Sequence, residues 1–373
     1  MIHLLNANAL HIPLADNTVQ CVITSPPYWG LRDYGTAEWI GGREDCNHVI
    51  GNSSVEYAAT TSSTLSGGKG TQISAKYGQR AVGDQCPKCG AIRKDQQLGL
   101  EETPAEFIAN MVAVFREVWR VLKDDGVIWV NMGDSYNANT GSGFNGQKRY
   151  DDANRNTKMP NSGLPPKNLV GIPWRLAFAL QDDGWILRSD IIWAKPNPMP
   201  ESVTDRPTKA HEYVFLLSKQ GRYFYDADAI KVRTKPQSLK RIQQANFANQ
   251  KGGPKDYRNG VNPNRSMRQT LENFAKDPNL ANRRSVWTVA TQPYSGAHFA
   301  TFPPKLIEPM ILAGSRPGDL VIDPFSGTAT VGMVARKHHR RYVGLELNPE
   351  YIELAKERTR AIQPTLINMG AAI

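Results

Sequence analysis

Residues 320–330, LVIDPFSGTAT, decide the fold expected for this chain. The apolar LVI run predicts a short buried strand that ends at Asp323, and the apolar residues of VGMVARK predict a helix directly after the motif. Between them, Gly327 permits a tight turn and a close approach of the backbone to a ligand. A helix that begins near Thr328 would point unpaired amides at that ligand. The stretch therefore predicts a ligand-binding unit of an α/β fold.

A second acidic element follows this unit. The run RYVGLE predicts a strand that ends at Glu346, 23 residues beyond Asp323. This distance is close to the roughly twenty residues at which a Rossmann-type carboxylate meets ribose hydroxyls. Asn348 and Pro349 suit a helix cap and a first helical turn. The glycines do not form GxGxxG, so a cofactor with a ribose and no phosphate fits better than a dinucleotide.

Near the start of the chain, the motif Ser25-Pro26-Pro27-Tyr28 follows the apolar run VQCVI. An exocyclic amine is a poor nucleophile because its lone pair is delocalised into the base ring, so an enzyme that methylates it must hold its protons with acceptors. Ser25 and a proline carbonyl are such acceptors, while the two prolines fix the backbone and Tyr28 offers a face on which an extruded base can stack. Alone, SPPY is equally typical of a turn that ends a strand.

Together, SPPY and DPFSGTAT resemble the amino-methylating DNA methyltransferases that use S-adenosylmethionine. The motif order resembles their circularly permuted beta type, with the catalytic motif first and the cofactor motif last. Further stretches that resemble this family are LLNANAL, GDSY, LVGIPWRLAFAL, DIIWAKPNPMPES, HEYVFLLSK and GAHFATFPPKL. The resemblance therefore covers most of the chain. It implies an α/β protein with a Rossmann-like class I methyltransferase fold, in which a mostly parallel sheet is doubly wound.

The resemblance also implies roles for individual residues. Asp323, Phe325, Gly327 and Thr328 would hold the methionine end of the cofactor, Glu346 would bind the ribose, and the block around His298, Phe302 and Pro303 would close over the cofactor. Asn8 stands where the family often has an aspartate, which puts that contact in doubt. The full set of expected cofactor residues is Asn8, Phe302, Asp323, Pro324, Phe325, Gly327, Thr328, Glu346 and Asn348. For Phe302 and Phe325, core packing is the alternative.

The expected catalytic residues are Ser25, Pro26, Pro27 and Tyr28, and they favour one target over others. Serine at position 25 favours N4 of a flipped cytosine in duplex DNA, while N6 of adenine is the alternative, because the adenine enzymes more often carry an acid there. A glutamine-modifying protein methyltransferase would prefer asparagine, and an inactive DNA-binding regulator would not retain both motif sets. Enzymes that methylate carbon 5 of cytosine need a cysteine after a proline, and the sequence has no Pro-Cys dipeptide. Cys21 lies within the strand before Ser25 and is interpreted as a core residue.

The other three cysteines form a candidate metal site with one histidine. Cys46 and His48 form a CxH pair, and Cys86 and Cys89 form a CxxC pair followed by Gly90. Two short chelating pairs about forty residues apart can supply the four ligands of a tetrahedral structural zinc. The polar segment between them has too few apolar residues to form a core, so a metal would hold it together. Free thiols or a redox pair are the alternative.

The positive charge of the chain is concentrated in residues 231–285. This segment holds 13 basic and 3 acidic residues, which gives +10, equal to the formal net charge of the whole chain. It also carries many amides and Tyr257 and Phe274, which suit phosphate neutralisation with base-edge contacts. We expect the segment to be a target-recognition region that binds double-stranded DNA, and a disordered basic insertion is the alternative.

One helix of the core can be predicted with both of its ends. Thr103-Pro104-Ala105-Glu106 is typical of a capping box with proline at the first helical position, and apolar residues then repeat at helical spacing. The turn signal Asp124-Asp125-Gly126 is predicted to end this helix, and VIWVN after it predicts a strand.

At 373 residues, the chain exceeds one typical domain, which favours a large core with insertions. The expected parts are a catalytic-motif part at 1–40, a zinc insertion at 41–100, a methyltransferase core at 101–230 with a mobile loop at about 137–163, the basic region at 231–285 and a cofactor-binding part at 286–373. No apolar stretch is long enough to span a bilayer, and the first residues lack an export signal. We therefore expect a cytoplasmic protein of bacterial, archaeal or phage origin. The family resemblance admits a cognate restriction endonuclease as a functional partner.

Overall fold

The computed structural model describes residues 2–30, 36–49, 51–54, 80–83, 85–137, 162–242, 279–292 and 302–362. The chain divides into two compact units. The first comprises Met1–Pro26, Met111–Asp134 and Ile172–Ile373, and the second comprises Pro27–Asn110 and Ser135–Gly171. Most of the expected mobile loop and of the basic segment lies outside the described residues. The expected domain boundaries stay a prediction.

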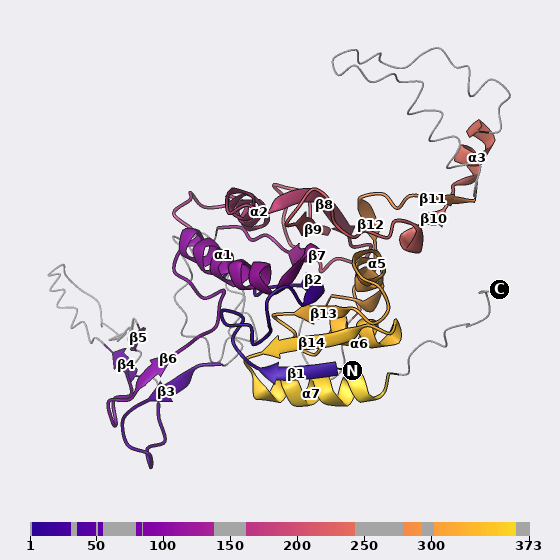
Figure 1. The fold of residues 1–373 in the computed structure, drawn as a ribbon. Helices are drawn as coiled ribbons and strands as arrows, with labels where there is room; N and C mark the ends of the chain where they lie inside the picture. The colour runs from indigo at the N-terminus through magenta and orange to yellow at the C-terminus, as the bar shows by residue number, and fades with distance from the viewer. Residues whose placement is uncertain are drawn as a thin grey trace, which may run out of the picture. The chain divides into compact units, whose positions relative to one another are not determined.

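The first unit is built on an eight-stranded sheet in the order β1-β14-β13-β2-β7-β9-β8-β12 (Figure 1). All neighbouring strands run parallel except β9, which is antiparallel to both β7 and β8. The mostly parallel α/β sheet predicted from the sequence is thus confirmed. In chain order the strands are β1 (Ile2–Asn6), β2 (Val19–Thr24), β7 (Leu122–Met132), β8 (Ile186–Ala194), β9 (His211–Ser218), β12 (Val286–Thr288), β13 (Leu320–Asp323) and β14 (Arg341–Glu346).

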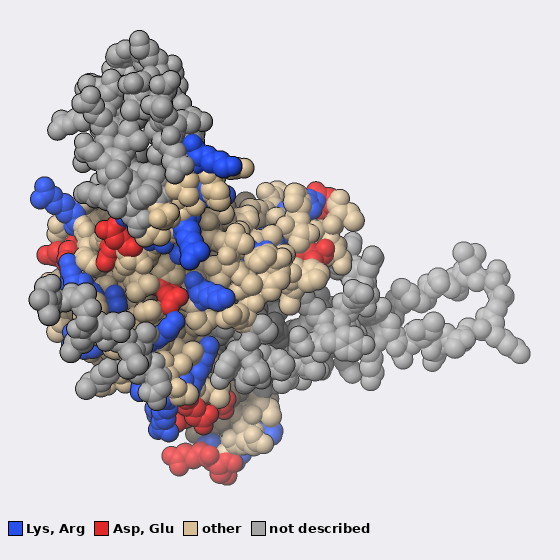
Figure 2. Space-filling model, turned by 90° about the vertical axis from the view of Figure 1, so that its right-hand side faces the viewer, with Lys and Arg blue, Asp and Glu red and all other residues tan. Residues whose placement is uncertain are grey.

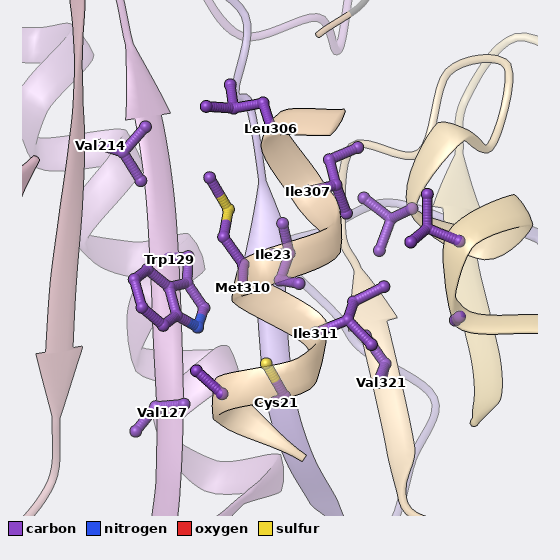
Figure 3. Packing of buried hydrophobic residues seen from close by; sticks show 14 of the residues in the cluster. Cys21, Ile23, Val127, Trp129, Val214, Leu306, Ile307, Met310, Ile311 and Val321 are labelled. Carbon is purple, nitrogen blue, oxygen red and sulfur yellow. The ribbon is translucent and has the colours of Figure 1, made fainter. Parts of the chain in front are cut away.

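Helices α5 (Pro304–Gly314), α6 (Thr330–Lys337) and α7 (Pro349–Arg360) share one apolar core with the sheet. Figure 3 shows Met310 and Ile311 of α5 packed over Cys21, Ile23 and Trp129 of the central strands. All six residues of β2 are buried, as expected for a strand covered on both faces. Cys21 is fully buried in this core, which confirms its interpretation as a core residue.

The opposite face of the sheet carries α1 (Pro104–Val121) and α2 (Ile172–Asp182). Trp174 of α2 packs edge-on against Tyr213 and Phe215 of β9, with ring centroids 5.5 and 5.2 Å apart. Side chains alternate across a strand, so Val214 between them points into the α5 core. Helices therefore cover both faces, as the doubly wound prediction requires.

Helix α1 begins as its sequence predicts but ends earlier. Thr103 Oγ1 accepts a hydrogen bond from the Glu106 amide at 3.2 Å, which confirms the predicted cap. We expected the helix to run to the turn signal Asp124-Asp125-Gly126, but it ends at Val121 and those residues lie within β7. Pairing with β2 explains the difference, because Val19 pairs with Leu122 and extends β7 back to the helix end.

The other described elements are short strands and two short helices. In the second unit, β3 (Glu38–Ile40) pairs antiparallel with β6 (Ile92–Lys94), and β4 (Gly51–Ser54) pairs antiparallel with β5 (Arg80–Gly83). In the first unit, η1 (Asp228–Ile230) precedes β10 (Val232–Arg233), which pairs with β11 (Leu280–Ala281), and α3 (Pro236–Ile242) follows β10. In the part of the chain that the structure describes, no helix combines the length and the apolar composition of a membrane span.

Candidate active site and metal centre

The polar residues predicted from the two motifs meet at one edge of the sheet. Strands β2, β13 and β14 are parallel neighbours, so Thr24, Asp323 and Glu346, which end them, lie at the same carboxyl edge (Figure 1). In open α/β sheets, this edge is where ligands bind. Ser25 follows Thr24 directly and so begins at the same edge.

Asp323 joins the two motifs. Its Oδ1 accepts hydrogen bonds from Thr24 Oγ1 at 2.7 Å and from the Phe325 amide at 3.0 Å. Its Oδ2 is buried and has no hydrogen-bond partner among the residues that the structure describes. Burial raises the pKa of this carboxyl to about 7, against the opposing effect of the two hydrogen bonds. An orphaned acceptor of this kind suits a cationic donor on a ligand, because an unpaired buried polar atom is costly.

Glu346 and Gly327 form the adjoining part of the site. Glu346 accepts hydrogen bonds from the amides of Gly327 and Asn348, each at 2.9 Å, and burial raises its pKa. Gly327 has a φ of 50°, and a Cβ placed there would meet no atom within 4 Å. The turn therefore needs glycine for its backbone conformation and leaves open space beside the carboxylate. Asn348 Oδ1 caps α7 through the Glu350 amide at 2.9 Å, as predicted.

Hydrogen bonds to β14 and α7 hold the turn that carries Gly327. Ser326 Oγ lies 2.9 Å from the hydroxyl of Tyr342, a fully buried residue of β14. Thr328 is buried, and its Oγ1 accepts a hydrogen bond from Arg358 of α7 at 2.7 Å. Helix α6 begins at Thr330 rather than near Thr328, because Ala329 takes a left-handed conformation with φ 57°. The turn is thus two residues longer than predicted.

The remaining predicted cofactor residues occupy varied positions. Pro324 is buried and Phe325 is half-buried beside Asp323. Phe302 packs against the apolar core, as its alternative interpretation predicted, and Pro303 precedes α5 as its N-cap. Asn8 Oδ1 accepts a hydrogen bond from the Leu10 amide at 2.9 Å and so stabilises its own turn after β1. His298 lies outside the described residues.

The catalytic motif spans the boundary between the two units. Ser25 and Pro26 end a segment of the first unit, and Ser25 is half-buried. Pro27 and Tyr28 open the second unit, where Gly99 approaches them so closely that a Cβ on it would lie 3.1 Å from the Tyr28 carbonyl oxygen. The Gly30 amide donates to the Gly99 carbonyl at 2.8 Å. Within the second unit, residues 27–30 are therefore held by the loop at Gly99.

A charged network further along the carboxyl edge was missed by the sequence analysis. Glu212, near the start of β9, pairs with Lys195 after β8 and accepts from Asn131 Nδ2 of β7 at 2.9 Å. Lys209 donates from Nζ to the Asp134 carbonyl at 2.6 Å, and burial lowers the pKa of Lys209. In the sequence, this network is indicated only by polar residues directly at predicted strand ends. Their proximity to one another follows from the strand order, which the sequence does not give.

The four predicted metal ligands come together in the second unit. The Sγ atoms of Cys46, Cys86 and Cys89 and a ring nitrogen of His48 all lie within 4.8 Å of one another. Cys89 Sγ is 3.2 Å from His48 Nδ1. Cys46 and His48 follow β3, while Cys86 and Cys89 precede β6, so the pairing of β3 with β6 brings the two halves together.

The surroundings of the cluster favour metal binding. Desolvation opposes ionisation of Cys86, but backbone amides and His48 outweigh it and lower the pKa of the thiol to about 6. Gly90, with φ 76°, donates from its amide to the Cys86 carbonyl at 2.8 Å, which forms the expected knuckle. Trp39 of β3 stacks on His48 with ring centroids 5.2 Å apart, a contact that the sequence did not predict. Three thiols and an imidazole form a donor set suited to tetrahedral zinc.

Comparison with known proteins identifies the family. The model of the N6 and N4 DNA methyltransferases, described as DNA methylase, matches residues 19–357. Type II methyltransferase M.Cfr9I of Citrobacter freundii is 38% identical over 361 residues, which cover 96% of this chain and 87% of that protein. Type II methyltransferase M.SmaI of Serratia marcescens is 39% identical over 345 residues, covering 91% of this chain and 83% of that protein.

A solved structure supports the fold. The PvuII DNA methyltransferase, described as cytosine-N4-specific, aligns with a TM-score of 0.52 and 17% sequence identity over 98% of this chain and 88% of that one. At this level of identity the likeness concerns the fold, and it agrees with the mostly parallel sheet described above. The family resemblance inferred from SPPY and DPFSGTAT is confirmed, and the chain belongs to the N6/N4 DNA methylase family and is a DNA methyltransferase.

Proposed function

We propose that this enzyme transfers a methyl group from S-adenosylmethionine to the exocyclic N4 amine of a flipped cytosine in duplex DNA. The hydrogen bond between Thr24 and Asp323 carries the proposal. It joins residues 299 positions apart in the chain, and Ser25 directly follows Thr24, the residue that donates to the carboxylate expected to hold the methyl donor. This supports a site for the methyl donor beside a site for the target amine.

The residues at the carboxyl edge fit such a donor. When bound, S-adenosylmethionine supplies an electrophilic methyl group on a positively charged sulfur. Asp323 Oδ2 is a buried acceptor with no partner in the described part of the chain, and it is suited to the ammonium of the methionine part. The open space at Gly327 leaves room beside Glu346, whose carboxylate is suited to ribose hydroxyls. No phosphate-binding glycine pattern is needed for this ligand.

Ser25 and the Pro26 carbonyl would hold the protons of the target amine. These acceptors let the nitrogen lone pair localise toward the methyl group. With the donor bound, the new N–C bond would form as the S–C bond breaks and leaves its electron pair on sulfur. The methylated nitrogen would then be cationic and acidic, and its proton would pass to solvent, either directly or by way of the Ser25 hydroxyl. Tyr28 would stack on the extruded base.

Duplex DNA is the substrate that the charge distribution favours. The structure describes the two ends of the basic segment, residues 231–242 and 279–285, and Arg283 there lies over the ring of Trp287 at 5.4 Å. In the view of Figure 2, Lys and Arg side chains are interspersed with Asp and Glu over the described surface. The excess of positive charge in residues 231–285 therefore remains the main feature proposed to neutralise phosphates.

We also propose that Cys46, His48, Cys86 and Cys89 bind one structural zinc ion. All four positions of a tetrahedral site are filled by protein ligands, which leaves no position for a catalytic water. The proposal is supported by the convergence of the four ligand atoms and by the short strands around them, which bury little apolar surface. Metal analysis of the purified protein tests it directly.

Mass spectrometry of nucleosides tests the proposed reaction. After incubation of unmethylated DNA with enzyme and S-adenosylmethionine, N4-methylcytosine is the expected product, and N6-methyladenine in its place would show that the adenine alternative is correct. Sequencing of the modified bases then maps the recognised site. Protection of that site from a nuclease that cuts it would support a cognate endonuclease as partner.

Ser25→Ala tests the catalytic assignment. The variant should lose turnover by about 100-fold or more, because an acceptor that acts in the transition state is removed. Binding of S-adenosylmethionine, measured by calorimetry, should stay within about twofold, since Ser25 is not among the donor ligands. Turnover equal to that of the unaltered enzyme would contradict the assigned role.

A further inference from the structure

The segment that joins β8 to β9 carries the most exposed of the large hydrophobic side chains reported among the described residues. Met199 is 86% exposed, against 59% for Val286, the next in order. It lies in the run Lys195-Pro196-Asn197-Pro198-Met199-Pro200, where three prolines alternate with other residues. Proline restricts the backbone and the residue before it, so the run has few conformations available. The methionine is thus displayed on a stiff support.

This segment is also anchored at several points. Asn197 Oδ1, two residues before Met199 in the chain, accepts a hydrogen bond from the Thr291 amide at 3.0 Å. The Lys195 amide donates to the Ala210 carbonyl at 2.8 Å, which closes the base of the segment. Within it, Arg206 pairs with Glu201 at 2.6 Å. These anchors lie on both sides of Met199 in the chain, while its own side chain is left largely exposed among the residues that the structure describes.

The segment lies at the edge of the sheet where the target base must enter. It begins at the carboxyl end of β8 and ends at the start of β9, and both belong to the same compact unit as Ser25. The strand order β2-β7-β9-β8 puts β8 three strand spacings from β2, or about 14 Å at ordinary spacing. The segment therefore lies at the ligand-binding edge of the sheet.

We propose that Met199 inserts into the duplex and occupies the space that the target base leaves when it is flipped. The inference rests on the proposed base-flipping reaction. Proteins that open or kink DNA use apolar wedges, methionine among them, to replace lost base stacking. A flexible side chain on a stiff anchored support is suited to this, because little backbone entropy is lost when the wedge enters the stack.

The test compares Met199→Ala with Met199→Leu on duplexes that carry the mapped site. On an intact duplex, Met199→Ala should lower kcat/KM by about 10- to 100-fold, because the cost of unstacking the base is no longer offset. Met199→Leu keeps an apolar wedge and should stay within about threefold of the unaltered enzyme. Fluorescence of pyrrolocytosine, a cytosine analogue that brightens when it is unpaired, at the target position should rise less with Met199→Ala than with the unaltered enzyme.

A second duplex, with an abasic site opposite the target base, separates a wedge from a structural role. The target in this duplex is already unpaired, so Met199→Ala should recover to within about threefold of the unaltered enzyme. An equal defect on both duplexes, or no defect on the intact one, would overturn the proposal. If the unaltered enzyme methylates neither duplex, the proposed function itself is contradicted. Failure of the wedge proposal and failure of the proposed function therefore give different results.

Discussion

The carboxyl edge of the large sheet and the Cys-His cluster hold their ligands in different ways. Asp323 and Thr24 end strands whose core residues are fully buried, and helices cover both faces of that sheet. Cys86 and Cys89 instead precede a three-residue strand that pairs with another three-residue strand. The first site is built by the apolar core before any cofactor arrives. The second has little core of its own and would depend on the proposed zinc for its stability.

Removal of the metal should have the largest effect, and it should be confined to the second unit. Chelation or Cys86→Ser should release zinc and make the segment 41–100 sensitive to protease, because structural zinc in small modules contributes on the order of 10 kcal/mol. Affinity for S-adenosylmethionine should change by less than about twofold, since none of its proposed ligands belongs to the cluster. Metal analysis, limited proteolysis and calorimetry measure the three quantities.

The fourth cysteine provides the control for this experiment. Cys21 is buried in the core of the first unit and is not near the metal ligands in sequence. Cys21→Ala should keep about one zinc per chain while it lowers the free energy of unfolding by about 1 kcal/mol through loss of packing. A protein that contains no metal as purified, or chelation that abolishes cofactor binding, would break the contrast between the two sites.

Thr24→Val should have an intermediate effect, this time on the carboxyl edge. The substitution keeps the shape of the side chain but removes the hydroxyl that donates to Asp323. Leaving the buried carboxyl with one donor fewer costs about 1–3 kcal/mol of unfolding free energy. The pKa of Asp323 should rise further, because a hydrogen bond that favours the carboxylate is lost, and cofactor affinity at neutral pH should fall by about tenfold.

Urea unfolding and calorimetry measure these changes, and Thr24→Ser is the matched control because it retains the hydroxyl. Zinc content should be the same in all three proteins. If Thr24→Val binds the cofactor as tightly as Thr24→Ser, the hydrogen bond does not link the two motifs energetically.

The smallest predicted effect is a dependence of cofactor affinity on pH. Asp323 has a pKa of about 7 in the folded protein, raised chiefly by burial, and Glu346 nearby raises it further. Only the carboxylate pairs with an ammonium group. Affinity for S-adenosylmethionine should therefore increase as the pH rises toward 7, by up to about tenfold per pH unit, and should level off above pH 7. Asp323→Asn should flatten this profile.

The stability of the cofactor-free protein should change in the opposite direction. The folded state retains the Asp323 proton up to about pH 7, whereas the unfolded state loses it near the ordinary pKa of the side chain, 3.8. The contribution of the protonated Asp323 to the free energy of unfolding is complete below that lower pH and is lost as the pH rises through about 7. Parallel rather than opposite trends in affinity and stability, measured from pH 5 to 8, would show that Asp323 is not the titrating group.

Local features were the part of the fold that sequence reasoning predicted well. The caps at Thr103 and Asn348 are confirmed, because a side chain that caps a helix acts on amides two or three residues away. Two helix boundaries were wrong, for different reasons. Helix α1 ends early because β7 pairs with the distant strand β2, whereas α6 begins late because Ala329 itself takes a left-handed conformation before the helix.

The candidate site shows the same difference between features that are local in the sequence and contacts that are not. Ser25, Asp323, Glu346 and the metal ligands were named from motifs whose chemistry can be read locally. The partners of these residues were not, since Tyr342 behind Ser326 and Trp39 on His48 are identified only by three-dimensional contact. Neither partner belongs to a motif, and an aromatic residue in a strand is usually a core residue.

From the sequence alone came the chemistry: two carboxylates at strand ends, an acceptor-rich proline turn, two chelating pairs and a segment that holds all the net charge. Tertiary structure decided which of these groups are neighbours. Val321 pairs with Cys21 and Ile322 with Val22, and this register lets Thr24 reach Asp323 from the other end of the chain. Parallel pairing is long-range and is chosen by burial of both sheet faces, so no local pattern encodes it.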